Sequence, residues 1–338
     1  MNNVLVIGAG KRTLGAVLPA LHCMPDRFRV AGVVARSVKQ VSYGLGTVTT
    51  RDSLDGIDWK AIDLVITAVS ISQVPRMLAS LARRDVGHAV LLHDTPVLPP
   101  SGLPAARHFA AFRRAYISED NIALPPLLLA KQLIDDGAIG QLKKIYFFHN
   151  GYKHHALASL KLLTGSTIER IVSRKFAGKL RQKTIDFASG VTALMYEPRD
   201  YATGRFLIEG DRGAIADYDY ANGSVRRIGY VVDGDVYRGL TLDGAPVPPA
   251  GLDADYLARI GPGIPEASPM NTMKLRGLMD LIVGALDDRS PFHYTPEDGI
   301  ADHLAIRIVD RVGYVPAQRT LARLVPLAKR VPFVQRAL

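Results

Sequence analysis

The stretch Asn3-Val-Leu-Val-Ile-Gly-Ala-Gly-Lys-Arg-Thr-Leu-Gly15 decides the fold of this 338-residue chain. Its apolar residues 4–7 predict a buried strand, which breaks directly into Gly8-Ala9-Gly10, and an apolar, helix-like stretch follows. A strand, a glycine turn and a helix in this order aim a helix N-terminus at a phosphate. We therefore expect a dinucleotide site here, although Thr13 replaces the third glycine of the usual G-x-G-x-x-G pattern. The alternative is a tight turn that has lost its ligand.

The second predicted strand, residues 29–35, indicates which dinucleotide binds. No carboxylate follows it to hold the ribose hydroxyls, whereas Arg36 and Ser37 could hold a 2′-phosphate. This favours NADP(H) over NAD(H). The expected cofactor contacts lie on the glycine turn and at the ends of four predicted strands: Gly8, Gly10, Lys11, Arg12, Thr13, Leu14, Ala35, Arg36, Ser37, Ala68, Ser70, Asp94 and Thr95.

The order of predicted elements divides the chain. Residues 1–120 alternate strands and helices, which predicts an α/β Rossmann domain with a doubly wound parallel sheet. Residues 121–317 predict an α+β domain on a mostly antiparallel open sheet, with helices near 127–134, 153–163, 273–286 and 295–312. We also expect a basic helix over 105–114, a surface loop over 245–269, and a basic amphipathic tail over 318–338. This tail either packs on its own domain or a partner subunit, or contacts an anionic membrane surface.

Composition narrows the function classes. The net charge of +10 favours an anionic ligand, but no basic run is interleaved with aromatic residues, which argues against nucleic-acid binding. The single cysteine, Cys23, forms neither a disulfide framework nor a cysteine zinc cluster. No apolar run has the length of a membrane span, and the chain opens directly with a strand. We expect a cytoplasmic enzyme of small molecules without a signal peptide.

The stretch Gly151-Tyr-Lys-His-His155 gathers titratable side chains at a predicted helix start. His155 is the best candidate for a catalytic proton carrier, and Lys153 and Tyr152 are further candidates. The positive end of the helix dipole should keep a histidine neutral and lower the pKa of a lysine. Neighbouring helical residues point about 100° apart, so we expect at most one of His154 and His155 to face the pocket. No carboxylate lies at ligand spacing, so the sequence predicts no metal site. The alternative is a polar helix cap.

Several stretches together resemble the Gfo/Idh/MocA family of oxidoreductases. Gly8-Ala-Gly10 with Leu18-Pro-Ala-Leu21 is similar to the family's opening, and Glu119-Asp-Asn121 with residues 133–140 is similar to its domain junction. Ile208-Glu-Gly-Asp-Arg-Gly213 is similar to a hairpin of its second sheet. The resemblance implies a Rossmann domain, a second α+β domain whose sheet is often an oligomer interface, and hydride transfer to or from a nicotinamide. We therefore expect a homo-oligomer, a dimer or a tetramer.

Two positions depart from the family pattern. The family's Glu-Lys-Pro is matched by Asp94-Thr95-Pro96, and a threonine does not replace an ammonium as proton donor. Of the family's Asp and His in the second domain, only His155 remains, because the matching Asp position is Gly151.

These departures leave several functions open. The leading hypothesis is an NADP-dependent oxidoreductase of an imine or ketone in a biosynthetic pathway, because hydride addition to an iminium needs no strong acid. Sugar or cyclitol dehydrogenase activity in polysaccharide assembly is an alternative. The other is dinucleotide binding without net redox, in a non-oxidising enzyme, a sensor or a partner subunit.

Overall fold

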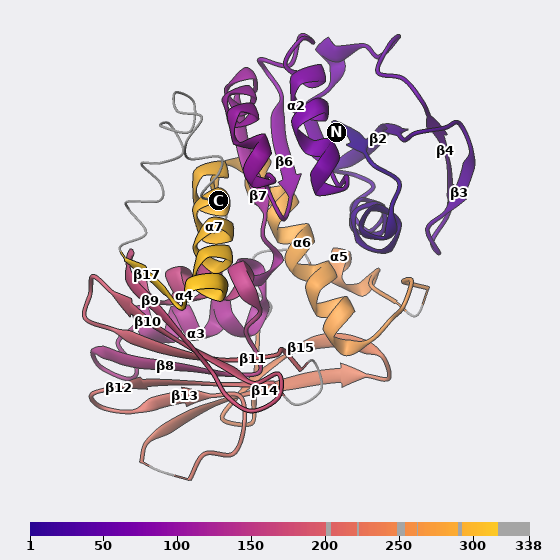
Figure 1. Cartoon of the computed structure of the whole chain (residues 1–338). Helices are drawn as coiled ribbons and strands as arrows, with labels where there is room; N and C mark the ends of the chain where they lie inside the picture. Colours follow the sequence, from indigo (N-terminus) through magenta and orange to yellow (C-terminus); the bar gives the residue numbers. More distant parts are fainter. Residues whose placement is uncertain (201–203, 222, 249–253, 262, 290–292, 317–338) are drawn as a thin grey trace.

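The computed structural model describes residues 1–200, 204–221, 223–248, 254–261, 263–289 and 293–316. In this part of the chain two sheets form, and helices lie between them (Figure 1). The predicted fold class, a parallel N-terminal sheet followed by a mostly antiparallel one, is confirmed. The basic tail, predicted over residues 318–338, lies outside the described residues.

The first sheet has seven strands in the order β3-β4-β2-β1-β5-β6-β7. Their bounds are β1 Asn2–Ile7, β2 Phe28–Val34, β3 Gln40–Ser42, β4 Thr47–Arg51, β5 Leu64–Thr67, β6 Val90–Asp94 and β7 Arg114–Ser118. All neighbours except β3 and β4 pair in parallel. The strand order reverses beside β1, which pairs with β2 on one side and β5 on the other. Open parallel sheets bind ligands at the carboxyl ends of the strands at such a reversal.

The helices beside this sheet are short. A π-helical turn at Thr13–Val17 runs into α1, Leu18–His22, and α2 spans Val74–Leu81. The basic helix predicted over residues 105–114 is wrong: a 3₁₀ segment spans Pro100–Ala111, and β7 begins at Arg114. Pro104 lies inside this segment and lacks the N–H that a regular α-helix would need there.

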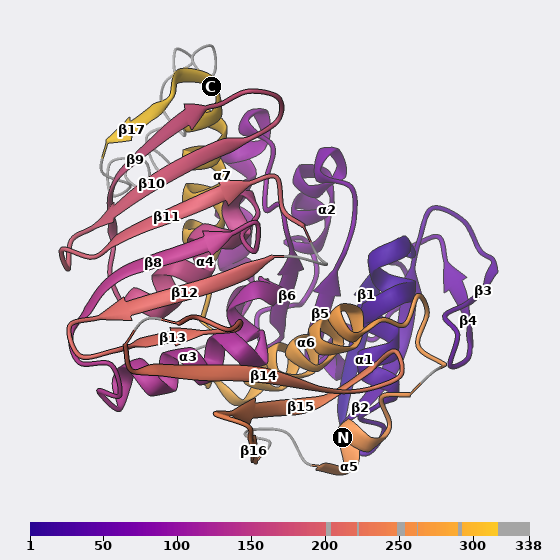
Figure 2. The same ribbon diagram turned by 90° about the horizontal axis from the view of Figure 1, so that it is seen from below.

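The second sheet has ten strands in the order β16-β15-β14-β13-β12-β8-β11-β10-β9-β17, and Figure 2 looks onto its face. The bounds are β8 Leu142–Phe148, β9 Ile168–Lys175, β10 Arg181–Phe187, β11 Thr192–Glu197, β12 Arg205–Gly210, β13 Ala214–Ala216, β14 Val225–Asp233, β15 Val236–Leu242, β16 Ala245–Val247 and β17 Tyr314–Pro316. Helices α3 Pro125–Asp135, α4 Lys153–Thr164, α6 Pro269–Asp287 and α7 Pro296–Val312 lie behind this sheet (Figure 2). The other face carries no helix of the described residues.

Helix α6 joins the two halves. It follows the second sheet in sequence, yet Leu278, Ile282 and Val283 belong to the apolar core around β1 and β5. Helix α7 starts as predicted, with a capping box in which Thr295 accepts from the backbone N–H of Asp298. The surface loop predicted over residues 245–269 is wrong in part, because β16 and the short helix α5, Ala254–Ala258, lie within it. Among the described residues no helix is long and apolar enough to cross a membrane.

Candidate active site

The glycine turn lies where the strand order of the first sheet reverses. Gly8 follows β1 with φ 111°, and its N–H donates to the carbonyl oxygen of Val34 at 2.8 Å. A Cβ on Gly8 would lie 2.0 Å from the carbonyl oxygen of Ala68, so only glycine fits there. A Cβ on Gly10 would meet nothing within 4 Å. The backbone at Gly10 is therefore open on the side that a Cβ would occupy, and helical residues follow it directly.

The residues that follow the turn face three environments. Lys11 is exposed and pairs with Glu266 at 2.9 Å. Thr13 is fully buried, and its hydroxyl has no hydrogen-bond partner among the described residues. Leu14 packs, half-buried, against the core beneath β1. Arg12 turns toward the carboxyl ends of β6 and β7.

Arg12 is held there by carboxylates. Its guanidinium donates two parallel hydrogen bonds to Asp120, at 2.7 and 2.5 Å, and its Nε lies 3.5 Å from Asp94. Burial alone would lower the pKa of Arg12, but Asp120 and Asp94 outweigh burial and raise it. Burial raises the pKa of Asp94 to about 6; Arg12 opposes this rise, and Asp120 and Glu119 add to it. Thr95 follows Asp94, beside the end of β6.

The residues expected at the adenosine end lie after β2 and β5. Arg36 and Ser37 are exposed and Ala35 is half-buried, and Thr50 of β4 fixes this segment by donating to the carbonyl oxygen of Ser37 at 2.7 Å. Arg36 has no ion pair with the described residues. Ala68 and Ser70 follow β5, and Ser70 is exposed.

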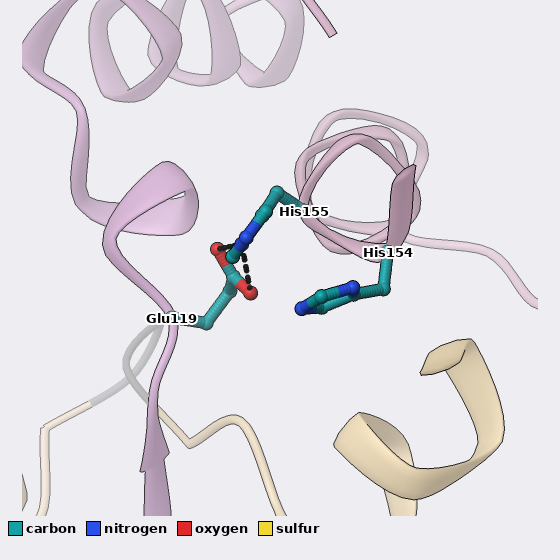
Figure 3. Close-up of side chains that lie close together, drawn as sticks. All are labelled: Glu119, His154 and His155. Atoms are coloured by element: carbon teal, nitrogen blue, oxygen red, sulfur yellow. Dashed lines mark hydrogen bonds and ion pairs between the residues drawn. The ribbon is translucent and has the colours of Figure 1, made fainter. Parts of the chain in front are cut away.

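The fold brings Glu119 and His155 together (Figure 3). Glu119 follows β7 directly and is fully buried, and His155 lies in the first turn of α4. Nδ1 of His155 lies 2.8 and 2.9 Å from the two carboxylate oxygens of Glu119. Burial alone would raise the pKa of Glu119, but the His155 ring and its hydrogen bond lower it to about 2. A carboxylate on Nδ1 fixes the ring tautomer and leaves Nε2 for a substrate.

The N-terminus of α4 is held in place by a carboxylate from β11. The backbone N–H of Lys153 donates to Glu197 at 3.1 Å, which places a carboxylate at the N-terminus of the helix. Glu197 also bonds the buried Lys183 of β10, and Lys183 lies 3.0 Å from Asp310 of α7. This ion network ties the helix that carries His155 to the second sheet.

The other two predicted catalytic residues face solvent. Tyr152 and Lys153 are exposed, and the Lys153 ammonium lies 4.9 Å from the centre of the Tyr152 ring. The sequence predicted a lowered pKa for Lys153, which is wrong, because a hydrogen bond to Tyr152 raises it. A lysine so exposed stays solvated and charged.

His154 points away from solvent. It is 7% exposed, and its ring centre lies 4.1 Å from that of His155 and 5.4 Å from that of His303 on α7. Burial lowers the pKa of His154 to about 3 and that of His303 to about 4. The Nε2 atoms of both are buried without a hydrogen-bond partner among the described residues.

The expectation that no carboxylate accompanies these histidines is wrong. Ligand atoms of Glu119, His154 and His155 all lie within 4.8 Å of one another. Sequence spacing could not find this group, because Glu119 is 36 residues from His155. The only sequence feature that pointed to Glu119 was the stretch 119–121. The family resemblance compares this stretch with the domain junction but assigns it no catalytic role.

Gly151 explains why no aspartate precedes the histidine. It is buried, and a Cβ on it would lie 2.9 Å from side-chain atoms of Phe147 and Ala156 and 3.0 Å from the sulfur of Met195. An aspartate there would force its neighbours apart, since a separation below 3.0 Å leaves no room even for a methyl group.

No family model and no curated protein matches the sequence. Solved structures match over nearly the whole chain. Gal80p from Saccharomyces cerevisiae, as a super-repressor mutant, has a TM-score of 0.66 at 13% identity and covers 95% of this chain and 98% of its own. An oxidoreductase from Agrobacterium radiobacter in complex with NAD⁺, L-tartaric acid and magnesium has a TM-score of 0.63 at 14% identity, covering 95% and 99%. An NAD-binding oxidoreductase from Klebsiella pneumoniae has a TM-score of 0.59 at 15% identity, covering 93% and 98%. The chain therefore has the fold that these oxidoreductases share with Gal80p.

Proposed function

We propose that this protein is a nicotinamide-dinucleotide-dependent oxidoreductase, an atypical member of the Gfo/Idh/MocA family. One observation carries the proposal. Arg12, two residues after the Gly8–Gly10 turn, donates hydrogen bonds to Asp120. The residue before Asp120 is Glu119, whose carboxylate hydrogen-bonds Nδ1 of His155. The dinucleotide turn and the histidine pair therefore belong to one connected site.

The cofactor we propose is NADP(H). The Gly8–Gly10 turn would hold the pyrophosphate, and Arg36 and Ser37 would hold the 2′-phosphate where NAD-specific sites carry an acid. The bound nicotinamide supplies the hydride chemistry. The chain must position the substrate and deliver or accept one proton.

We assign His155 as the residue that contacts the substrate. Its Nε2 has no hydrogen bond to the described residues, and the ring is 23% exposed while Glu119 beneath it is fully buried. Glu119 orients the ring through Nδ1, so Nε2 can hydrogen-bond a substrate oxygen or nitrogen. Thr95 supplies no ammonium, which favours an imine or an easily reduced ketone over an unactivated alcohol. Tyr152 and Lys153 stay as further candidates at the rim.

The test has two steps on the purified protein. NADPH and NADH binding are measured by the fluorescence of the reduced nicotinamide, and turnover of ketones and imines is then followed by its absorbance. We expect NADPH to bind more tightly, His155→Ala to lower kcat at least about 100-fold with little change in NADPH affinity, and the exposed-site control His88→Ala to match the native protein. Normal turnover by His155→Ala contradicts the assignment.

Dinucleotide binding without redox is the second candidate function. Two observations favour it: the site carries neither of the family's other two proton-transfer residues, and the fold is also that of Gal80p, whose solved mutant is described as a super-repressor. Tight NADPH binding with no turnover of any ketone, imine, sugar or cyclitol would select this second function.

A further inference from the structure

We propose that Glu119, His154 and His155 form a binding site for one divalent transition-metal ion, with Zn²⁺ as the simplest occupant. The inference goes beyond the proposed function, because metal binding here requires neither a dinucleotide nor a hydride step. It rests on three observations: the mutual distances of the ligand atoms, an unpartnered buried imidazole nitrogen, and the excess of carboxylates around the cluster.

The distances need only small side-chain adjustments. The three ligand atoms lie within 4.8 Å of one another, and Nδ1 of His155 is 2.8 Å from Glu119. In a tetrahedral zinc site, bonds of about 2.0–2.1 Å place ligand atoms about 3.3 Å apart. An ion would therefore replace the proton between His155 and Glu119 with a slight opening of that pair, and the His154 ring would turn toward it. Both rings lie on the side of α4 that faces the carboxylate (Figure 3).

His154 supplies the second observation. Its ring is more than nine-tenths buried, yet Nε2 has no hydrogen-bond partner among the described residues. The Nε2 of the adjacent His303 is in the same condition. Buried polar atoms are nearly always hydrogen-bonded, so an unpartnered nitrogen beside a carboxylate and a second imidazole points to a ligand.

The charges around the cluster favour a cation. Asp94, Glu119 and Asp120 bring three carboxylates to the ends of β6 and β7, where they interact with one another and share the guanidinium of Arg12. A divalent ion would balance this excess. Two imidazoles with one carboxylate select a zinc-like ion, because Mg²⁺ and Ca²⁺ prefer oxygen ligands.

The number of ligands indicates what kind of site this is. Three protein ligands leave a fourth position open, as in catalytic rather than structural zinc sites. If the ion and the dinucleotide bind together, a substrate oxygen or nitrogen would occupy that position, and the ion would supply the positive charge that Thr95 lacks. This last step alone rests on the proposed function.

The experiment uses the untagged full-length protein and Zn²⁺ or Co²⁺ alone. After chelation and dialysis, we expect calorimetry to show one Zn²⁺ per chain, Co²⁺ to give the visible absorption of a four-coordinate site, and Zn²⁺ to raise Tm. His154→Ala and His155→Ala should each weaken Zn²⁺ binding at least about 100-fold, since even outer-sphere partners of metal sites are worth 10–100-fold. His88→Ala is the matched control and should bind Zn²⁺ as the native protein does.

Two results overturn the proposal: no stoichiometric Zn²⁺ binding by the native protein, or native affinity in both histidine variants. Circular dichroism and Tm of the metal-free variants confirm that they are folded, and Glu119→Gln, which keeps the shape of the side chain, provides a third variant. NADPH affinity is measured in the same preparations. Absence of Zn²⁺ binding by the native protein together with intact NADPH binding refutes the metal site alone, so the two proposals fail separately.

Discussion

The pair Arg12–Asp120 gives the sharpest quantitative prediction, because it links the Gly8–Gly10 turn to the Glu119–His155 pair. The two side chains are 26% and 11% exposed and share two parallel hydrogen bonds. Arg12→Met keeps most of the apolar stem and removes the charge. It leaves Asp120, Asp94 and Glu119 close together without a guanidinium.

The expected cost follows from this geometry. Removing one partner of a fully buried ion pair costs about 3–5 kcal/mol, and the partial exposure of Arg12 reduces this to about 2–3 kcal/mol. The cost should also depend on pH. The pKa of Asp94 is about 6 in the folded protein, above its ordinary value, so ionising Asp94 destabilises the fold as pH rises. Arg12 opposes that rise, so its loss raises the pKa further. The loss of unfolding free energy in Arg12→Met, relative to the native protein, should therefore be smallest near pH 4 and should grow from pH 5 to 8.

Urea unfolding of Arg12→Met, Asp120→Asn and the double variant, at pH 4.5 and 8, measures both effects. We expect a coupling energy of about 1.5–3 kcal/mol at pH 8. The exposed control Arg36→Met should stay within about 0.5 kcal/mol of the native protein. A coupling energy below 0.5 kcal/mol, or a deficit that shrinks as pH rises, refutes the reasoning. The NADPH affinity of Arg12→Met shows whether Arg12 also binds a phosphate. If Arg12 is purely structural, the affinity stays nearly unchanged; if Arg12 binds a phosphate, the affinity falls.

Three further predictions concern other parts of the molecule. Arg36→Gln should weaken NADPH binding about 10–100-fold and leave NADH binding unchanged in fluorescence titrations, because one charge-assisted contact to the 2′-phosphate is lost; equal effects on both cofactors contradict the assignment. Burial raises the pKa of Asp217 to about 6, so folding stability should fall by about 3 kcal/mol between pH 4 and 7 through this group. Asp217→Asn should flatten that pH dependence in urea unfolding, and an unchanged slope contradicts it. Phe148 stacks on Tyr146 and Tyr196 on the helix-free face of the second sheet, with ring centres 5.5 and 5.7 Å away. Phe148→Glu should therefore dissociate a homo-oligomer in light scattering, and an unchanged mass refutes this interface.

The local sequence pattern predicted the elements well where the pattern was strong. The apolar run over residues 4–7 and the helix start near residue 295 are short-range signals, and β1 and α7 lie where they were expected. Residues 105–114 were mistaken for an α-helix because their composition is helical, although they belong to a 3₁₀ segment that starts at Pro100 and ends at Ala111. The strands β16 and β17 were missed because each has only three residues.

The chemistry of the site depends on contacts that no local pattern contains. The sequence suggested His155 but not Glu119, because the carboxylate arrives from the end of β7 through the tertiary fold. It suggested Arg12 as a phosphate contact but could not show that Asp120, 108 residues away, binds it. It predicted a lowered pKa for Lys153 from the helix dipole, and a neighbouring tyrosine outweighs that field.

The resemblance to the oxidoreductase family implies an aspartate at the position of Gly151, and packing explains why none is there. The space for its side chain is filled by Phe147, Ala156 and Met195. The carboxylate partner of His155 is instead Glu119, which follows β7 and does not lie on α4. A histidine in this site therefore keeps an acidic partner on Nδ1 although the aspartate is absent. Glu119 is fully buried, and the His155 ring together with the two donors of Asn121 offsets the cost of burying its charge.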